Sequence, residues 1–234
     1  MKQPEAPIAC LSSMATRGLL VELAGVYEGH TGWPVTLTAT GGVDAAGRVR
    51  QGEMTDVVIL AAGVMRALAG EGHILPDSLA PVVVSGIAVA VRADASRPNI
   101  ATELAVREAI LNSGRIAYST GPSGDHLLHL LQEWSILPQM EDRLIRARPG
   151  VPVARLLASG EADLGFQQLS ELLGRPGITV LGPLPPTIQA LTTFTAGIAR
   201  TSKQPGAARS LIEALASPNV DDIKRRHGMA CCSL

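Results

Sequence analysis

The feature that most limits the fold of this chain is a repeated order of apolar strand, small-residue turn and amphipathic helix. Residues 6–13, APIACLSS, form a short apolar run ending in hydroxyls. Residues 14–32 follow with apolar side chains at helical spacing, and Gly29 and Gly32 are expected to stop this helix. The order recurs to give three strands alternating with helices within the first 72 residues. Such alternation predicts a parallel sheet with helices on its faces.

A second α/β segment follows the first. The run PVVVSGIAVAVRA at residues 81–93 indicates a buried strand or strand pair, and residues 102–114 indicate a helix with Thr102 as N-cap and Gly114 as its stop. Further strands are expected at 115–119, 162–168 and 177–185, helices at 125–136, 151–161, 205–217 and 218–228, a linking stretch at 137–150, and a crossing back to the first lobe at 190–200. The pattern predicts two α/β lobes.

Composition excludes several kinds of partner. The chain has 234 residues, is 46% hydrophobic, and carries 20 basic and 21 acidic residues, so it can bury a core but offers no basic stripe for nucleic acid. Aromatic residues make up 3%, which argues against a stacking platform for bases or sugars. No apolar run reaches the roughly 18 residues of a transmembrane helix, so no membrane segment is expected.

The cysteines and the N-terminal residues indicate the cellular compartment in which the chain works. Cys10, Cys231 and Cys232 show no CxxC spacing, so structural or incidental thiols in a reducing compartment are expected rather than a redox site. The first 18 residues hold no uninterrupted apolar segment of the secretory kind. We therefore expect a cytoplasmic protein as written, or a periplasmic one if the chain is a trimmed form of a longer precursor.

Three turns are candidates for a ligand site, because ligands of open parallel sheets bind beyond the carboxyl ends of the strands. Ser12 and Ser13 end the first strand, Gly41 and Gly42 end the second, and the stretch STGPSG at 119–124 follows a strand of the second lobe. Each places small residues and backbone N–H groups at a helix start, which favours an anion. The alternative for any one turn is an ordinary helix N-cap.

The candidate acid–base and charged residues each have a plainer interpretation. His126, beside Asp125, is the best-placed titrating side chain, but a first-turn His among leucines is often a packing residue. Three further groups have ordinary surface or helix-end roles as alternatives to ligand contact: the pairs Arg48 with Arg50 and Arg146 with Arg148, and the carboxylate Glu171. His129 could start a metal site with His126, but no ligand cluster accompanies them, so no metal is expected.

Several enzyme classes lack their signatures in this sequence. There is no GxxxxGK[ST] loop, no GxGxxG, no GxSxG elbow and no HExxH. Nucleotide hydrolysis, dinucleotide redox chemistry, triad hydrolysis and zinc-dependent proteolysis are therefore not expected, and no cofactor is predicted.

The stretches LSSMA, TATGGVDAAGRVRQGEMTDVVILAA, GPSGDHLLHLL and VARLLASGEADLGFQQLSEL, in this order, resemble the type II periplasmic solute-binding superfamily. The resemblance is to its molybdate-binding-protein-like group and covers nearly the whole chain. It implies an α/β fold of two lobes, each a mixed, mostly parallel sheet flanked by helices, with a ligand cleft between them. Lobe one would be residues 1–82 plus 191–234, and lobe two residues 83–190.

The resemblance also places ligand contacts. Ser13 matches the serine of the first loop, and Ser123 falls where the second-lobe loop contributes a backbone amide. Gly41 and Gly42 replace serines of molybdate binders, and Gln168 replaces a tyrosine. These departures remove donors that a dehydrated oxyanion needs, because an unpaired buried oxygen costs about 1 to 3 kcal/mol. The glycines leave space, and an amide both donates and accepts, so a larger carboxylate is expected.

Within the superfamily, SSMATR, YSTGPSG and GFQQLSELL are similar to a branch that includes aconitate isomerases. That branch implies an allylic proton shift on an unsaturated tricarboxylate. The alternative is a solute-binding protein for an oxyanion or carboxylate, serving an ABC transporter or acting as a sensor. His126 is the catalytic candidate, and the ligand-binding candidates are Ser12, Ser13, Gly41, Gly42, Ser119, Gly121, Ser123, Gly124, Gln167 and Gln168.

Overall fold

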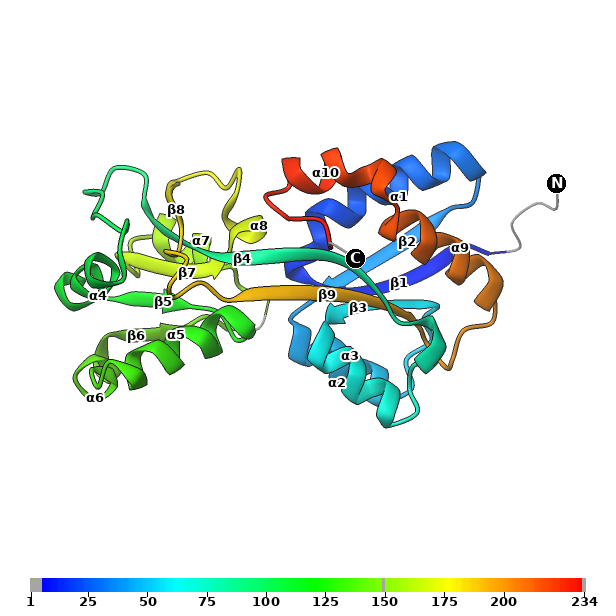
Figure 1. The fold of residues 1–234 in the computed structure, drawn as a ribbon, viewed down its shortest axis with the longest axis horizontal. Helices are drawn as coiled ribbons and strands as arrows, with labels where there is room; N and C mark the ends of the chain where they lie inside the picture. The colour runs from blue at the N-terminus through cyan, green and yellow to red at the C-terminus, as the bar shows by residue number, and fades with distance from the viewer. Residues whose placement is uncertain (1–5, 149, 233–234) are drawn as a thin grey trace. The chain divides into compact units, whose positions relative to one another are not determined.

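A computed structural model describes residues 6–148 and 150–232 of the chain (Figure 1). Contacts divide the chain into two compact units. The first unit contains the residues up to Val84 and those from Thr192 on, and the second is Ser85–Leu191. The chain passes from the first to the second unit within strand β4 (Ala80–Arg92) and returns at the start of β9 (Leu191–Ile198). The run at 81–93 is therefore one long strand rather than a strand pair.

The sheet of the first unit is mixed. Strand β1 (Ile8–Ser13) pairs in parallel with β2 (Val35–Thr40) on one side and β3 (Val57–Ala61) on the other. Strand β9 pairs antiparallel with β3, which gives the order β2-β1-β3-β9. Because β1 and β2 are parallel and in register, their carboxyl ends meet at one edge of the sheet.

Helices cover both faces of the first unit's sheet (Figure 1). One face packs against α1 (Arg17–Thr31), α9 (Pro205–Ala216) and α10 (Asp221–Arg226), and the other against α2 (Gly42–Arg50) and α3 (Ala62–Gly70). Each face has its own apolar core of buried side chains. The alternation read from the sequence arises from this packing, since each helix buries one stripe against the sheet.

The second unit repeats this plan around a different sheet. Strand β4 pairs antiparallel with β7 (Leu164–Gln168) and with β8 (Ile178–Pro183). Strand β5 (Ile116–Tyr118) pairs in parallel with both β7 and β6 (Leu144–Arg146). The carboxyl ends of β5, β6 and β7 therefore lie at one edge, where the candidate loop after β5 begins.

Helices also lie on both faces of the second sheet (Figure 1). Helices α4 (Glu103–Asn112), α5 (Pro122–Glu133) and α6 (Leu137–Met140) share one apolar core with it. Helices α7 (Val153–Ala158) and α8 (Leu169–Leu172) share the other. Short 3-10 turns lie at Met14–Thr16, Pro76–Ser78, Glu141–Arg143 and Pro218–Val220.

The stretch expected to be a simple link, residues 137–150, holds regular structure instead. Its described part forms α6, a 3-10 turn and the edge strand β6. A three-residue strand is too short to show the alternation by which strands are recognised, so the sequence pattern missed it. Gly29 does not stop the first helix either: α1 runs to Thr31, and Gly32 ends it with a left-handed φ of 70°.

Gly114 has a different role from the helix stop expected of it. Helix α4 begins at the predicted N-cap, where the Thr102 side chain accepts a hydrogen bond from Ala105 N at 3.1 Å, but it ends at Asn112 with an extended Ser113. A Cβ on Gly114 would lie 2.8 Å from Asp163 Oδ2. That carboxylate accepts the Arg115 N–H at 2.8 Å, so glycine is needed there for close approach.

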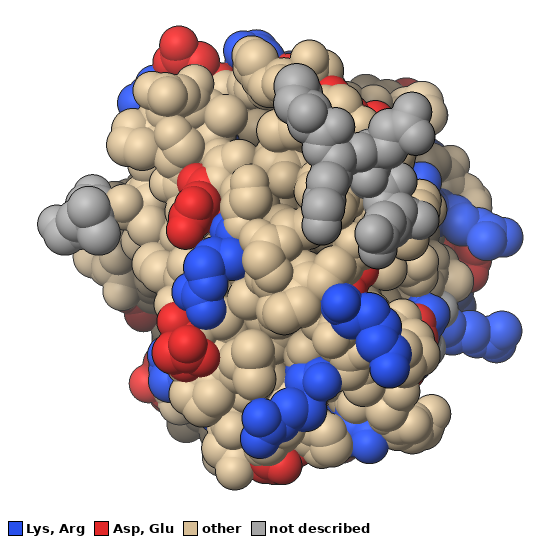
Figure 2. All heavy atoms as spheres, turned by 90° about the vertical axis from the view of Figure 1, so that its right-hand side faces the viewer, with Lys and Arg blue, Asp and Glu red and all other residues tan. Residues whose placement is uncertain are grey.

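The distribution of charged residues on the surface and the lack of long apolar helices among the described residues agree with the composition. On the face drawn in Figure 2, basic and acidic side chains are interspersed within a larger uncharged area. Within residues 6–148 and 150–232, no helix is both long and apolar enough to cross a bilayer.

Candidate functional site

In the first unit, the two serines of β1 reach the edge where β2 also ends. Ser13 is in register with Thr40, so it lies beside the residue that precedes Gly41. Ser12 is fully buried, and its hydroxyl donates to the Ser13 carbonyl at 3.2 Å. The Ser12 hydroxyl is thus used within the strand.

The Ser13 hydroxyl is the unusual atom of this edge. Ser13 is 6% exposed, and its Oγ is buried with no hydrogen-bond partner among the described residues. Leaving a buried polar group unpaired costs about 1 to 3 kcal/mol. Such a group in a native structure needs an explanation, and a role in a binding or catalytic site is one. The hydroxyl can donate one hydrogen bond to an oxygen of a bound anion.

The glycines after β2 begin helix α2 and leave open space. A Cβ on Gly42 would meet no atom within 4 Å, and one on Gly41 would meet only the Asp44 carboxylate, with Oδ2 at 3.4 Å. Asp44 lies in the first turn of α2, where an acid interacts favourably with the helix dipole. The sequence analysis did not single out Asp44, whose negative charge already compensates part of the positive helix dipole at the start of α2.

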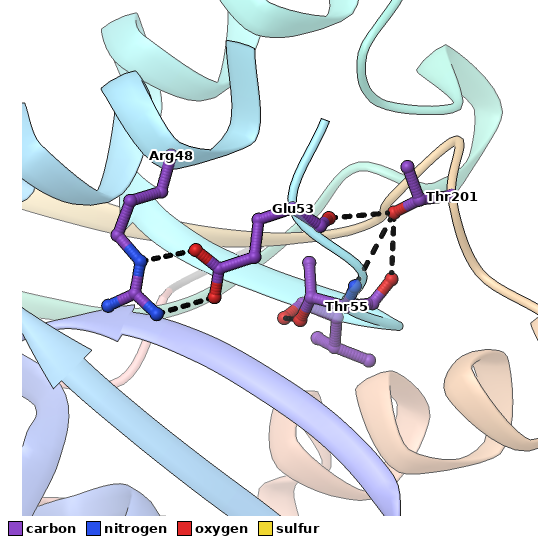
Figure 3. A network of polar contacts seen from close by, with 5 residues as sticks. Arg48, Glu53, Thr55 and Thr201 are labelled. Carbon is purple, nitrogen blue, oxygen red and sulfur yellow. Dashed lines mark hydrogen bonds and ion pairs between the residues drawn. The ribbon is translucent and has the colours of Figure 1, made fainter. Parts of the chain in front are cut away.

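Arg48 and Arg50 are committed to carboxylates within the first unit. Arg48 forms a two-pronged ion pair with Glu53, and the Glu53 carbonyl accepts a hydrogen bond from Thr201 Oγ1 at 3.1 Å (Figure 3). Arg50 pairs with Glu71 through bonds of 2.7 and 2.9 Å. These partners favour the surface interpretation of both arginines over ligand steering.

In the second unit, the loop after β5 is organised around the Ser119 hydroxyl. Its Oγ accepts the Gly121 N–H at 3.2 Å and lies 2.8 Å from Ser123 Oγ. The Gly121 carbonyl accepts the N–H groups of Gly124 at 2.9 Å and Asp125 at 3.2 Å. Among the described residues the Ser123 N–H has no backbone acceptor, so it is the free donor of this helix start.

The pair of hydroxyls leaves one proton for a ligand. If Ser119 donates to Ser123, the Ser123 proton is free, and in the opposite orientation the Ser119 proton is free. Ser123 is 1% exposed, and Pro122 supplies the first helical residue without an N–H of its own. The loop therefore offers one O–H and one N–H to an anion.

Gly124 has a packing reason that the sequence did not reveal. A Cβ there would lie 1.9 Å from the Ser119 carbonyl oxygen and 2.9 Å from the Tyr118 ring. Only glycine allows α5 to pass this close to the end of β5. Of the candidates in this loop, Gly124 is explained by the fold itself.

Gln167 and Gln168 end β7 on opposite faces of the sheet, because side chains alternate along a strand. Both are buried, at 3% and 2% exposure. Gln167 Oε1 accepts the Val153 N–H of α7 at 3.0 Å, and its Nε2 donates to Glu171 Oε1 at 2.8 Å. The Gln167 amide is thus held inside the unit, which leaves it less suited to direct ligand contact than expected.

Glu171 lies in the first turn of α8, where the sequence suggested a helix-start carboxylate. Burial raises the pKa of its carboxyl to about 7, while the nearby Arg175 and the Gln167 hydrogen bond act in the opposite direction. Titratable groups poised near neutral pH concentrate at functional sites. The only signal in the sequence was its position four residues after Gln167, which an isolated reading could not separate from a helix-end carboxylate.

His126 is held by the fold through one ring nitrogen. Its Nε2 lies 2.8 Å from the Ile188 carbonyl, and a carbonyl can only accept, so Nε2 carries the hydrogen. In the neutral ring Nδ1 is then the basic nitrogen. His129 instead faces Glu133 at 3.3 Å on the exposed side of α5. The described part of the chain contains no group of three or more His, Cys, Asp or Glu side chains suited to a metal.

Arginines also reach the edge of the second unit where this loop lies. Arg146, the last residue of β6, is in register with Tyr118, and the Ala147 N–H donates to the Tyr118 carbonyl at 2.8 Å. Arg146 and Arg148 are both exposed. Positive charge on this edge suits a ligand with more than one carboxylate.

A separate cavity of about 470 Å³ opens elsewhere in the second unit, between residues 97–101 and 179–183 along β8. It contains none of the predicted site residues. The loops after β1 and β5, which contain the buried donors Ser13 and Ser123, are the better candidates for an anion site.

Comparison with known proteins gives three further findings. A family model described as bacterial extracellular solute-binding protein matches residues 8–230. An aconitate isomerase from a Pseudomonas species is 34% identical over 225 residues, covering 92% of this chain and 84% of that protein. Solved structures share the fold at low identity.

Two of these structures illustrate the range. The periplasmic molybdate-binding protein of Azotobacter vinelandii has a TM-score of 0.81 and 19% identity, covering 97% of this chain and 100% of the other. The protein AgtB of A. tumefaciens R10, in complex with agropinic acid, has a TM-score of 0.73 and 13% identity, covering 97% and 83%. At these identities the likeness shows the fold alone.

Proposed function

This chain belongs to the family of bacterial extracellular solute-binding proteins, and on that premise we propose that it binds a small polycarboxylate and isomerises it by an allylic proton shift. The proposed substrate class is an unsaturated tricarboxylate such as aconitate. One observation carries the choice of reaction: the 34% identity with an aconitate isomerase extends over 92% of the chain.

The chemistry requires stabilisation of negative charge at a carboxylate. A base removes a proton from the carbon next to the double bond, the electron pair shifts along the allylic system, and a proton returns at its far end. No net proton, electron or atom is gained or lost. The intermediate resembles an enolate, and fixed hydrogen-bond donors stabilise such a charge without reorganising.

Each unit supplies donors of this kind. Ser13 offers a buried hydroxyl without a partner among the described residues, and Ser123 offers an N–H at the start of α5. Arg146 and Arg148 add positive charge at the second edge. The sequence resemblance predicts that one ligand engages both sets of donors.

We assign the proton transfer to His126. The Ile188 carbonyl holds its Nε2–H, so Nδ1 can accept a proton from one end of the allylic system and return it to the carbon at the other end.

A non-catalytic binding protein is the second candidate. The match to the solute-binding family favours it. In this case the ligand would be a carboxylate or oxyanion, and the partner a transporter or a signalling protein.

Proton NMR in heavy water separates the two candidates. Purified protein is incubated with cis-aconitate, and the expected result is formation of trans-aconitate with deuterium at the allylic carbon. The His126→Gln variant is the matched control, since its amide can keep a hydrogen bond to Ile188 but cannot act as a base. If wild-type protein binds cis-aconitate by calorimetry without conversion or exchange, the isomerase proposal is wrong and the binding protein is right.

A further inference from the structure

Glu171 is a half-buried carboxylate that the proposed reaction does not use. It lies in α8, the short helix that directly follows β7, and accepts a hydrogen bond from Gln167 Nε2 at 2.8 Å. Its own backbone carbonyl accepts the Nε–H of Arg175 at 3.1 Å. The Gln167 amide therefore holds the carboxylate, and Arg175 holds the backbone of the same residue.

The Gln167 amide links this carboxylate to a second helix. Because Gln167 Oε1 accepts the Val153 N–H that begins α7, the amide cannot rotate without losing both bonds. The Gln167 amide thus joins Glu171 to the end of β7 and to the start of α7.

The register of the sheet puts this arrangement beside the ligand loop. Tyr118 of β5 is in register with Phe166 of β7, so the next residues, Ser119 and Gln167, are neighbours across the two strands. Adjacent strands lie about 4.8 Å apart, and the Gln167 side chain spans the further gap to Glu171, so strand spacing and one side-chain length together put the Glu171 carboxyl on the order of 10 Å from Ser119. At that distance inside a protein a unit charge is only partly screened.

From this geometry we propose that Glu171 is a positioning residue whose charge sets the affinity of the second unit's loop edge for polycarboxylates. The neutral carboxyl permits tight binding of a polyanion, and the ionised carboxylate weakens it. The inference rests on the proposed function for the ligand class but not for the reaction.

The protonation state of Glu171 changes in the physiological range, because burial raises the pKa of its carboxyl to about 7. The elements packed against α8 are β7, which has no charged residue, and α7, whose Arg155 is exposed. Arg175 follows α8, and α5, which packs on β7, carries His126, Asp125 and the exposed pair of His129 and Glu133. These neighbouring groups also act on a bound anion, so the test must isolate Glu171.

Calorimetric titration with tricarballylate, a saturated tricarboxylate that cannot isomerise, provides this test. For the wild-type protein the affinity should fall about tenfold between pH 6 and pH 8.5, as expected for one added charge at this distance. The Glu171→Gln variant keeps the hydrogen-bonding shape without the charge, and it should bind about tenfold more tightly than wild type at pH 8.5 and equally at pH 6. Glu161→Gln, at an exposed position of the same unit, should follow the wild type.

A second measurement does not depend on the variant folding well. The side-chain carboxyl carbon of Glu171 in ¹³C-labelled wild-type protein should titrate near pH 7, and saturating tricarballylate should move its midpoint upward, because linkage is reciprocal. An unmoved midpoint, or equal pH dependence in Glu171→Gln and wild type, overturns the inference alone. Absence of tricarballylate binding at every pH overturns the proposed function and this inference together.

Discussion

The hydroxyls of Ser119 and Ser123 lie 2.8 Å apart, and Ser119 also accepts the Gly121 N–H at 3.2 Å. One side chain thus shapes the turn and orients the buried hydroxyl of the next helix. The donors of this loop are arranged before any ligand arrives, which reduces the entropy that binding must lose.

Replacing Ser119 tests this arrangement. Ser119→Ala removes the acceptor of Gly121 N–H and the partner of Ser123, so tricarballylate affinity should fall about tenfold, the loss of roughly one oriented hydrogen bond. The unfolding free energy should fall by only about 1 kcal/mol. Calorimetry and thermal unfolding check the two numbers. Thr120→Ala, in the same loop, is the control, and an equal loss of affinity there would contradict the assigned role of Ser119.

The two neighbouring serines of β1 should respond in opposite ways. Ser13→Ala removes a buried hydroxyl that has no partner among the described residues, so the protein should be unchanged or more stable by up to about 1 kcal/mol, while ligand affinity falls at least tenfold. Ser12→Ala removes a hydroxyl that donates to the Ser13 carbonyl, so it should cost about 1 kcal/mol of stability. Chemical denaturation and calorimetry on both variants give the comparison. Lower stability in Ser13→Ala with normal affinity would show that this hydroxyl is structural.

Gly124 should tolerate no side chain. In Gly124→Ala the new Cβ would lie 1.9 Å from the Ser119 carbonyl oxygen, a backbone atom that cannot rotate away, so a loss of about 3 kcal/mol or more is expected. The matched change Gly47→Ala lies inside α2 with no atom within 4 Å of the new Cβ, and it should stabilise the protein by about 0.5 to 1 kcal/mol. Urea unfolding measures both. Near-equal stabilities of the two variants would contradict the close approach.

The sequence predicted the repeating units and their turns well, because helix and strand periods are local patterns. Ser13, Gly41 and Ser119 all lie at carboxyl ends of strands, as the alternation implied. The three-residue strand β6 was missed because it shows no period, and β9 showed nothing in its residues to reveal that it runs antiparallel to β3.

Roles that depend on tertiary neighbours could not be predicted. Gly124 looked like a ligand contact, but its packing against Ser119 is set by how α5 meets β5. Arg48 could have been a ligand-steering or a surface charge, and its ion pair with Glu53 favours the second. Glu171 looked like a helix-end carboxylate, and its unusual pKa arises from burial, which no local pattern encodes.

That burial leads to a prediction about stability and pH. A carboxyl whose pKa rises from 4.5 to about 7 on folding binds its proton more tightly in the native state. The native state therefore holds more protons than the unfolded state between these two pH values, and the contribution of Glu171 to stability falls as pH rises from about 4.5 to 7.

The full pKa difference corresponds to about 3 kcal/mol of unfolding free energy, and partial solvent access reduces this to between about 1 and 3 kcal/mol. Glu171→Gln should lose this dependence and exceed the wild type in unfolding free energy at pH 8 by that amount. Urea denaturation at pH 5 and pH 8, with Glu161→Gln as control, measures it, and a wild-type difference equal to that of Glu171→Gln would show that Glu171 is ionised throughout.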